Sequence, residues 1–246
     1  MNLILLLDED FDDDARRRAC DAGDAVVVEL AGRRFRHVRT VHRAAPGREL
    51  AVGRLGGRVG RGVVETLAEE HLTLRVRLDT DPPCKLPLTL LLALPRPKVL
   101  RRVLQTVATM GVPRVVLMNA WRVEKSYWRS SALEPAGLLE PLRLGLEQGR
   151  DTILPVVETK RLLVPFCRDE LAALAAGTRR LLAHPGANAP CPRALDEPVT
   201  LALGPEGGFI ERELDLFARH GFAAVSLGPR PLRVEQSVPA LLARLF

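Results

Sequence analysis

Short apolar runs separated by glycine-bearing turns make up the first third of the chain. They predict β-strands at residues 3–7, 25–30, 49–52, 62–65 and 72–78. Strands this short and this closely spaced are typical of a small β-barrel. We therefore expect a small barrel domain at the start of the chain.

One helix is expected to interrupt these strands. It begins at the acidic run 12–14, and the basic run 16–18 follows it closely. Acidic residues at the start of a helix and basic residues further along suit the helix dipole. We interpret the acidic run as a helix end in preference to a metal site.

A proline-rich segment then divides the chain. Residues 79–87 contain three prolines, which exclude a continuing helix or a central strand. We place the domain boundary here. The expected organisation is a barrel domain at 1–78, a linker at 79–87 and a second domain at 88–246.

The spacing of apolar residues changes after this linker. A run at 88–94 that is apolar at every position except Thr89 predicts a strand buried on both faces. The remainder predicts strands at 115–118, 153–157, 180–183, 199–203 and 223–227, and helices at 99–110, 133–148, 169–176, 211–220 and 239–246. This alternation is typical of an α/β domain with a largely parallel sheet covered by helices on both faces.

The composition excludes several classes of protein. Of the 246 residues, 47% are hydrophobic and 27% are charged, as in an average globular protein. No apolar run approaches the roughly 20 residues of a membrane span, and the run at 3–7 lacks the basic start of a signal peptide. The four cysteines are far apart and form no CxxC pair. We therefore expect a cytoplasmic protein with no metal site and no membrane association.

The charge balance is basic. The net charge is +6 and the isoelectric point is about 9.7, and nearly all the basic residues are arginine. Arginine binds phosphate groups with two parallel hydrogen bonds, which favours a polyanionic partner such as a nucleic acid. A GC-rich genome that encodes arginine in place of lysine explains the same composition, so charge alone leaves both readings open.

Two successive predicted strands end in the same tripeptide, Leu-Gly-Pro. The first, at 203–205, continues as Glu-Gly-Gly-Phe, and the second, at 227–229, continues as Arg-Pro-Leu-Arg. Ligands of parallel sheets bind at the carboxyl ends of strands, and glycine there allows a ligand to approach the main chain. The glycine spacing matches neither a P-loop nor a dinucleotide fingerprint. The two loops are expected to hold a flat group such as a purine, the alternative being two tight turns without a ligand.

At these residues the chain resembles the RsmE family of the SPOUT superfamily, bacterial enzymes that methylate N3 of one uridine in 16S ribosomal RNA. The resemblance rests on Leu-Ala-Leu-Gly-Pro-Glu-Gly-Gly-Phe at 201–209, the Gly-Phe-x-x-Val-Ser-Leu-Gly-Pro-Arg-x-Leu-Arg-x-Glu pattern at 221–235 and Ala-His-Pro at 183–185. Gln-Gly-Arg at 148–150 matches as well. It covers essentially the whole chain, and residues 1–78 resemble the PUA-like barrel of that family.

The resemblance implies a deep trefoil knot in the second domain, with S-adenosylmethionine bound in it by main-chain contacts from both Leu-Gly-Pro loops. It also implies a homodimer and, as the partner, 16S ribosomal RNA within the small ribosomal subunit. The expected cofactor-binding residues are Leu182, His184, Leu203, Gly204, Glu206, Gly207, Gly208, Leu227, Gly228 and Leu232. Two of them have other readings: Glu206 could hold ribose hydroxyls, pair with Arg230 or stabilise its turn, and His184 could be structural.

The sequence departs from the family pattern in two places. Where the family has Lys-Gly after the first strand of the second domain, this chain has Pro-Arg-Pro-Lys at 95–98. The usual Leu-Arg-Thr-Glu-Thr-Ala becomes Leu-Arg-Val-Glu-Gln-Ser at 232–237. The threonine hydroxyls are lost, whereas Arg233 and Glu235 are kept.

These two kept residues are our candidates for catalysis. N3 of uracil carries a proton at neutral pH, so methyl transfer needs a donor that stabilises the anion on the ring oxygens and a group that takes the proton. We assign the first role to Arg233. Glu235 is expected to orient Arg233 or to accept the proton, the alternative being a surface ion pair.

RNA contact is expected at two basic regions. Three aromatic residues fall between Trp121 and Trp128 and alternate with basic ones, a pattern typical of proteins that stack single-stranded RNA; a lid packed on a dimer partner is the alternative. The densest basic stretch, which includes His37 and His42, lies in the barrel, where a solvated edge is the alternative. The expected RNA-binding residues are Arg33, Arg34, Arg36, Arg39, Arg43, Arg96, Lys98, Trp121, Arg122, Lys125 and Trp128.

Two rival functions stay open at this point. The first is a non-catalytic RNA-binding protein, and the second is a SPOUT enzyme that acts on transfer RNA or on another ribosomal site. Titration with the cofactor separates the first from an enzyme, and mapping of the methylated base separates the second.

Overall fold

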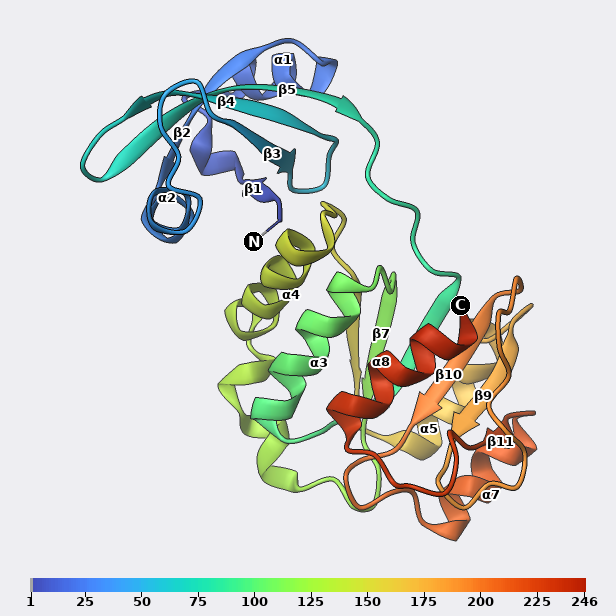
Figure 1. Cartoon of the computed structure of the whole chain (residues 1–246). Coiled ribbons are helices and arrows are strands. Elements are labelled where there is room, and N and C mark those ends of the chain that lie inside the picture. The colour runs from blue at the N-terminus through green and yellow to red at the C-terminus, as the bar shows by residue number, and fades with distance from the viewer. Residues whose placement is uncertain (1) are drawn as a thin grey trace. The chain divides into compact units, whose positions relative to one another are not determined.

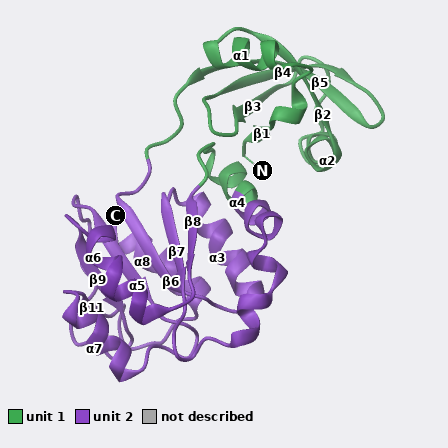
Figure 2. Cartoon of the chain, turned by 180° about the vertical axis from the view of Figure 1, so that it is seen from behind, with its two compact units in different colours: residues 1–84, 143–154 green, residues 85–142, 155–246 purple. Residues whose placement is uncertain are grey.

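The computed structural model describes residues 2–246 (Figure 1). The chain forms two compact units (Figure 2). The first unit contains residues 1–84 and 143–154, and the second contains residues 85–142 and 155–246. The division therefore assigns a segment from the middle of the chain to the first unit, which the proline-rich boundary did not indicate.

The first unit is built on a curled five-stranded sheet. Its strands are β1 (Ile4–Leu6), β2 (Val26–Ala31), β3 (Glu49–Arg54), β4 (Val59–Leu67) and β5 (His71–Thr80), in the order β1-β3-β4-β5-β2. All neighbouring pairs are antiparallel except β1 and β3. Alternate residues of β5, from Leu72 to Leu78, are buried in the core, as the period of two in the sequence predicts. The five predicted strands are confirmed.

The first predicted helix is also confirmed, as α1 (Asp14–Ala22). The carboxylate of Asp13 accepts a hydrogen bond from the main-chain N–H of Arg16 at 2.7 Å, which caps the helix. The helix ends at Gly23, whose φ of +94° favours glycine.

A second helix of this unit, α2 (Gly32–Thr40), was not predicted. Its side chains are mostly basic, and no side chain caps its start, so neither a wide apolar stripe nor a capping residue indicates it. Phe35 and Val38, spaced by three residues, fix one face of the helix in the core. The basic stretch is therefore a helix beside the sheet.

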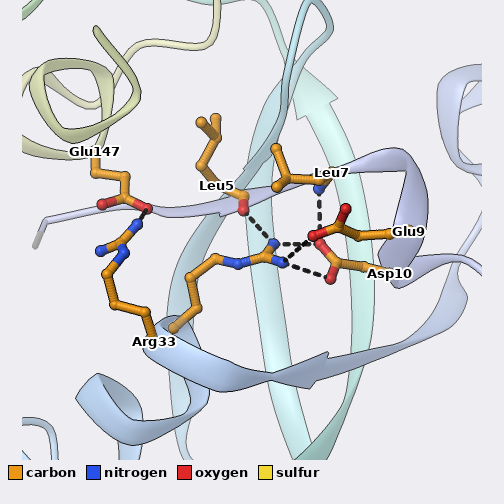
Figure 3. Close-up of polar contacts among 7 residues, drawn as sticks. Leu5, Leu7, Glu9, Asp10, Arg33 and Glu147 are labelled. Atoms are coloured by element: carbon orange, nitrogen blue, oxygen red, sulfur yellow. Dashed lines mark hydrogen bonds and ion pairs between the residues drawn. The ribbon is translucent and has the colours of Figure 1, made fainter. Parts of the chain in front are cut away.

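A buried ion pair joins α2 to the 3₁₀ turn η1 (Asp8–Asp10) that follows β1 (Figure 3). The guanidinium of Arg34 forms two bonds to the carboxylate of Asp10, one of them 2.8 Å from Nη2 to Oδ1, and it also donates to the carbonyl oxygen of Leu5 at 2.8 Å. The N–H of Leu7 donates to Asp10 Oδ2 at 2.7 Å. Burial raises the pKa of Asp10, against the opposing effect of Arg34. Arg34 is thus committed to the interior, which corrects its expected RNA contact.

The inserted segment is held to the first unit in a similar way. Arg33 Nη2 lies 2.6 Å from Oε1 of Glu147, a residue that is buried (Figure 3). The carbonyl oxygen of Glu147 accepts hydrogen bonds from the N–H groups of Asn2 and Leu3, both at 3.0 Å. These contacts explain why the end of a helix that starts in the second unit belongs to the first.

The second unit contains a six-stranded sheet in which all neighbouring strands are parallel. Its order is β11-β9-β10-β6-β7-β8, with β6 (Leu88–Ala93), β7 (Arg114–Met118), β8 (Val156–Lys160), β9 (Arg179–Ala183), β10 (Val199–Leu203) and β11 (Ala223–Val225). Every residue of β10 is buried. The predicted parallel sheet is confirmed, although β8 begins three residues later than predicted.

Helices cover this sheet. They are α3 (Pro97–Thr109), α4 (Pro135–Gly149), α5 (Leu163–Asp169), α6 (Leu171–Leu174), α7 (Glu211–Arg219) and α8 (Val234–Leu245), with 3₁₀ turns η2 (Lys125–Arg129) and η3 (Ser131–Leu133). Figure 1 shows α3 and α8 side by side in front of the sheet and α5 behind it. The helix predicted at 169–176 was wrongly placed: α5 and α6 occupy residues 163–174.

The last helix is longer than predicted. It begins at Val234, and Pro239 lies in its interior. The sequence prediction took this proline as a helix start, because proline lacks the N–H that an interior position uses. Val234, Val238 and Leu241 are buried against the unit, and this packing offsets the lost hydrogen bond.

Native thiol chemistry should be confined to Cys84. Cys84 is exposed, whereas Cys20, Cys167 and Cys191 are buried. Burial raises the pKa of Cys20 to about 11, and burial together with the charge of Glu213 raises that of Cys167 to about 12. Because the thiolate is the reactive form, mass spectrometry after alkylation at pH 8 should detect one label in the native protein. Rapid labelling of a second cysteine would contradict this burial.

Within residues 2–246, no helix is long and apolar enough to cross a membrane. The same residues contain no cluster of His, Cys, Asp and Glu side chains suited to a metal ion.

Candidate active site

A crevice of about 520 Å³ opens at the carboxyl ends of three strands of the second unit. The two Leu-Gly-Pro loops that follow β10 and β11 form two of its walls, and Ala183, His184 and Pro185 after β9 form a third. The strands β10 and β11 follow one another in the sequence, but β9 lies between them in the sheet. The crevice therefore has three walls, where the repeated tripeptide indicated two.

Glycine gives these loops their shape. Gly208 and Gly228 have φ values of +73° and +125°, and no atom lies within 4 Å of the position that a Cβ would occupy on either. The N–H of Gly208 donates to the carbonyl oxygen of Pro205 at 2.8 Å, and the N–H of Gly228 donates to Oγ of Ser226 at 3.0 Å. Both turns are thus closed internally, with their main chain open toward the crevice.

The structure brings together most of the residues that we expected to bind the cofactor. His184, Leu203, Gly204, Glu206, Gly207, Gly208, Leu227, Gly228 and Leu232 all line the crevice. Leu182 does not: its side chain is buried within β9, one residue before the strand end. Leu182 therefore contributes to the packing of the sheet below the crevice.

Glu206 is fixed by a main-chain contact. Its Oε1 accepts a hydrogen bond from the N–H of Arg96 at 3.0 Å. Arg96 is the N-cap residue of α3, so this bond ties the glycine-rich loop to the start of that helix. The structure favours this positioning role over the pairing of Glu206 with Arg230 that the sequence left open.

Arg233 lies at the mouth of the crevice, as the N-cap residue of α8. Its N–H donates to Oε1 of Gln236 at 3.3 Å, and the hydroxyl of Ser237 donates to its carbonyl oxygen at 3.0 Å. Gln236 and Ser237, which replace the usual residues of the family pattern, thus hold the backbone of Arg233. Among the described residues, no carboxylate forms an ion pair with its guanidinium, which leaves the side chain available to a ligand.

Glu235 does not line the crevice. Its carboxylate lies 3.7 Å from Nη1 of Arg102 on α3, and only 17% of its side chain is exposed. It therefore joins α8 to α3 and contacts neither Arg233 nor a group in the crevice. Glu235 is paired with Arg102 and not with Arg233, which corrects its expected role in orienting Arg233, and it does not line the crevice in which a proton acceptor would act.

The two tryptophans of the aromatic segment differ in their surroundings. The side chain of Trp121 is 78% exposed. The indole N–H of Trp128 donates to Oδ1 of Asn119 at 3.0 Å, and the guanidinium of Arg161 lies 5.5 Å from its ring centroid. Trp128 is thus part of a cation–π pair, whereas Trp121 is largely exposed to solvent.

Glu213 is a residue of this region that the sequence analysis missed. It lies in the first turn of α7, and only 7% of it is exposed. Its Oε1 accepts from the N–H of Trp121 at 2.7 Å and its Oε2 accepts from the N–H of Ile210 at 3.0 Å. The spacing of an acid three residues after the start of a helix is a capping signal that could have indicated it.

The remaining predicted RNA-binding residues are divided between the two units, and of these Arg122 lines the crevice. Arg122 lines the crevice and donates to the carbonyl oxygen of Gly207. Lys98 and Lys125 are exposed in the second unit, and Arg36, Arg39 and Arg43 are exposed in the first. Arg39 lies over the ring of Phe35 and donates to the carbonyl oxygen of Glu69 at 2.8 Å. These side chains offer positive charge to solvent, unlike Arg34.

The chain is similar to known proteins over most of its length. The RNA methyltransferase domain family matches residues 82–245. Ribosomal RNA small subunit methyltransferase E from Mycobacterium tuberculosis is 30% identical, over 90% of this chain and 86% of that protein. The protein of the same name from Treponema pallidum is 28% identical, over 88% of this chain and 84% of that protein.

Two solved structures share the fold over nearly the whole chain. A methyltransferase from Legionella pneumophila, solved with the cofactor SAM, has a TM-score of 0.69 at 22% identity and covers 99% of this chain and 96% of its own. A ribosomal RNA small subunit methyltransferase E from Neisseria gonorrhoeae, bound to S-adenosyl methionine, has a TM-score of 0.70 at 20% identity and covers 99% and 95%. At this identity the likeness concerns the fold.

Proposed function

Since this chain belongs to the RNA methyltransferase family that includes ribosomal RNA small subunit methyltransferase E, we propose that it methylates ribosomal RNA of the small subunit with S-adenosylmethionine as the methyl donor. At the finer level, we propose N3 of one uridine in 16S ribosomal RNA as the acceptor. The observation that carries the proposal is the convergence of both Leu-Gly-Pro loops and Arg233 on one crevice.

The crevice suits the proposed cofactor in size and in chemistry. Its volume of about 520 Å³ lies in the range of sites for small molecules, roughly 300–1,000 Å³. The open space beside Gly208 and Gly228 lets a purine approach the main chain, which a side chain on either residue would prevent. Leu203, Leu227 and Leu232 supply apolar contacts. When bound, S-adenosylmethionine supplies a methyl group on a positively charged sulfur.

We propose that Arg233 acts on the acceptor base. Its guanidinium is at the crevice, is always charged and offers donors in a planar fork. Directed at a ring oxygen of uracil, it stabilises the negative charge that develops when N3 releases its proton to solvent water. The hydrogen bonds of Gln236 and Ser237 hold the backbone of Arg233, which fixes the point from which its side chain extends.

The finer features of the family are part of the same proposal. We infer a trefoil knot in the second unit. The contacts between a preceding loop and the end of α8 support it: the N–H groups of Ala194 and Leu195 donate to the carbonyl oxygens of Arg244 and Leu245 at 3.2 and 2.6 Å, respectively. We also infer a PUA-like barrel in the first unit and a homodimer. The curled sheet of the first unit supports the barrel.

The exposed arginines of the first unit and the aromatic segment are proposed as RNA contacts. Replacing Trp121 and Trp128 together by alanine should weaken RNA binding, because a stacked base contributes about 1–3 kcal/mol. Fluorescence anisotropy with a labelled fragment of small-subunit ribosomal RNA measures this effect. Cofactor affinity, measured by calorimetry, should stay within about twofold, since neither indole lines the crevice.

The opposite result is as easily recognised. Unchanged RNA affinity in the double variant would assign these rings to packing, for example on a second copy of the chain.

The function itself is tested by mapping the methylated base. Ribosomal RNA from cells with and without the gene is digested and its modified nucleosides are identified by mass spectrometry. The proposal expects one N3-methyluridine in the small subunit to disappear without the gene. A lost methyl group in transfer RNA or in the large subunit would establish a different substrate, and a purified protein that binds no S-adenosylmethionine would establish a non-catalytic RNA-binding protein.

A further inference from the structure

An exposed aromatic ring on an anchored backbone stands beside the crevice. The indole of Trp121 is 78% exposed, so folding gains little from it, because the hydrophobic contribution follows the apolar area removed from water. Its main-chain N–H is nevertheless bound at 2.7 Å by a carboxylate of the protein interior, Glu213. Capping of α7 needs only the bond of Glu213 to Ile210, so the second bond, to Trp121, is the one that fixes the backbone under this exposed ring.

The anchor joins two loops. The second oxygen of Glu213 accepts from the N–H of Ile210 at 3.0 Å, at the end of the glycine-rich crevice loop. A buried carboxylate is costly unless hydrogen bonds satisfy it, and here the two N–H groups come from segments 89 positions apart in the sequence, Trp121 and Ile210. Neither segment can move without leaving an oxygen of Glu213 unpaired.

A second contact holds the residue that follows Trp121, Arg122. The guanidinium of Arg122 donates to the carbonyl oxygen of Gly207, and its side chain covers that residue so closely that a Cβ on Gly207 would lie 3.0 Å from Arg122 Cδ. Residues 121–122 are thus attached to residues 207–213 at two points. The backbone of Trp121 is therefore anchored beside the crevice, while its side chain remains exposed to solvent.

We propose that Glu213 is a positioning residue for the RNA substrate: it fixes the backbone of Trp121 so that the indole forms a preorganised stacking surface for a base of the RNA next to the crevice. The inference rests on the proposed function, in particular on RNA contact at Trp121. A surface that is ordered before binding loses less conformational entropy when the base arrives. Glu213 contacts no substrate in this arrangement and acts only through Trp121.

A double-mutant cycle tests this role. Glu213→Gln keeps the size of the side chain but replaces one acceptor oxygen by an NH₂ group that cannot accept a hydrogen bond. We expect RNA affinity to fall about five- to tenfold in Glu213→Gln, in line with the loss of one hydrogen bond. In the Trp121→Ala background the same substitution should change RNA affinity by less than about twofold, because residues that act through one another are not additive.

Matched controls separate positioning from folding. Glu211→Gln removes an exposed carboxylate from the same first turn of α7 and should leave RNA affinity unchanged. Cofactor affinity should be retained in Glu213→Gln. If that variant does not fold, Glu213→Asp, which keeps the charge and shortens the reach, takes its place in the cycle, with native folding checked by circular dichroism.

Each outcome of the cycle is decisive. Equal losses of RNA affinity in the wild-type and Trp121→Ala backgrounds would overturn the inference and make Glu213 a structural residue. If Trp121→Ala alone leaves RNA affinity unchanged, the inference falls together with the RNA contact at Trp121. Methyl transfer to small-subunit ribosomal RNA by that same variant would show that the proposed function stands without it.

Discussion

Replacing Asp10 by alanine is expected to lower the free energy of unfolding of the first unit by about 3–5 kcal/mol, the usual effect of removing one partner of a buried ion pair. The guanidinium of Arg34 would stay in the interior without its carboxylate, and the N–H of Leu7 would lose its acceptor. Urea denaturation followed by circular dichroism measures the change.

Two further variants test whether the loss of stability in Asp10→Ala comes from the buried ion pair. Arg36→Ala, an exposed arginine on the same helix, should change the free energy of unfolding by less than about 0.5 kcal/mol. The double variant Asp10→Leu, Arg34→Met should recover most of the loss, because it removes both charges and fills their volume. A small effect of Asp10→Ala would mean that solvent reaches this pair.

The pH dependence of the same pair has a definite sign. Burial raises the pKa of Asp10 in the folded protein, so the folded state binds this proton more tightly than the unfolded state. Protonation of Asp10 therefore favours folding, and its contribution declines as pH rises above 3.8 through the folded pKa. Acid unfolding of the first unit should accordingly be driven by other carboxylates, and Asp10→Asn should not increase its acid stability.

Replacing Arg233 by alanine is expected to reduce the rate of methyl transfer at least tenfold, and toward the 10²–10³-fold typical of a lost donor to a developing anion. Single-turnover assays with labelled S-adenosylmethionine measure the rate. Cofactor affinity should change by less than about twofold, since the main-chain contacts of the two loops remain. Arg219→Ala, at an exposed position in the last turn of α7, serves as the control and should transfer methyl groups normally.

An intermediate variant sharpens the assignment. Arg233→Lys keeps a positive charge but loses the planar fork of donors, so partial activity would indicate that charge at this point matters. Wild-type turnover in Arg233→Ala would reject the role of Arg233 in the reaction.

The parallel sheet could be predicted because its strands are buried on both faces. Residues 88–94 and 199–203 are apolar at every position except Thr89 and Thr200, and runs this short and this apolar are typical of strands in a sheet covered on both faces. The position of β9 between β10 and β11 had no local signal, because strand order is set by the packing of connections across the whole sheet. The repeated tripeptide therefore indicated two walls of the crevice, the resemblance added His184 of the third, and the order of the three strands was left open.

The remaining differences also come from long-range contacts. Glu235 follows Arg233 by two residues. At the start of α8 the two side chains point in different directions, so that Arg233 lines the crevice and Glu235 pairs with Arg102. Helix α2 depends on Phe35 and Val38 packing in the core, whereas its exposed face resembles a basic loop. The assignment of residues 143–154 to the first unit rests on Glu147, a partner far along the chain from Arg33 and Asn2.

The strand that separates β10 from β11 sets a width for the crevice. Neighbouring strands lie about 4.8 Å apart, so the roots of the two Leu-Gly-Pro turns are spaced by two such steps, roughly 9.6 Å. One planar ring with carbon contacts of about 3.5–4.0 Å on each side fills 7–8 Å of that span. Under the proposed function, the strand between β10 and β11 therefore leaves a span that suits one heterocycle between the two turns better than a stacked pair.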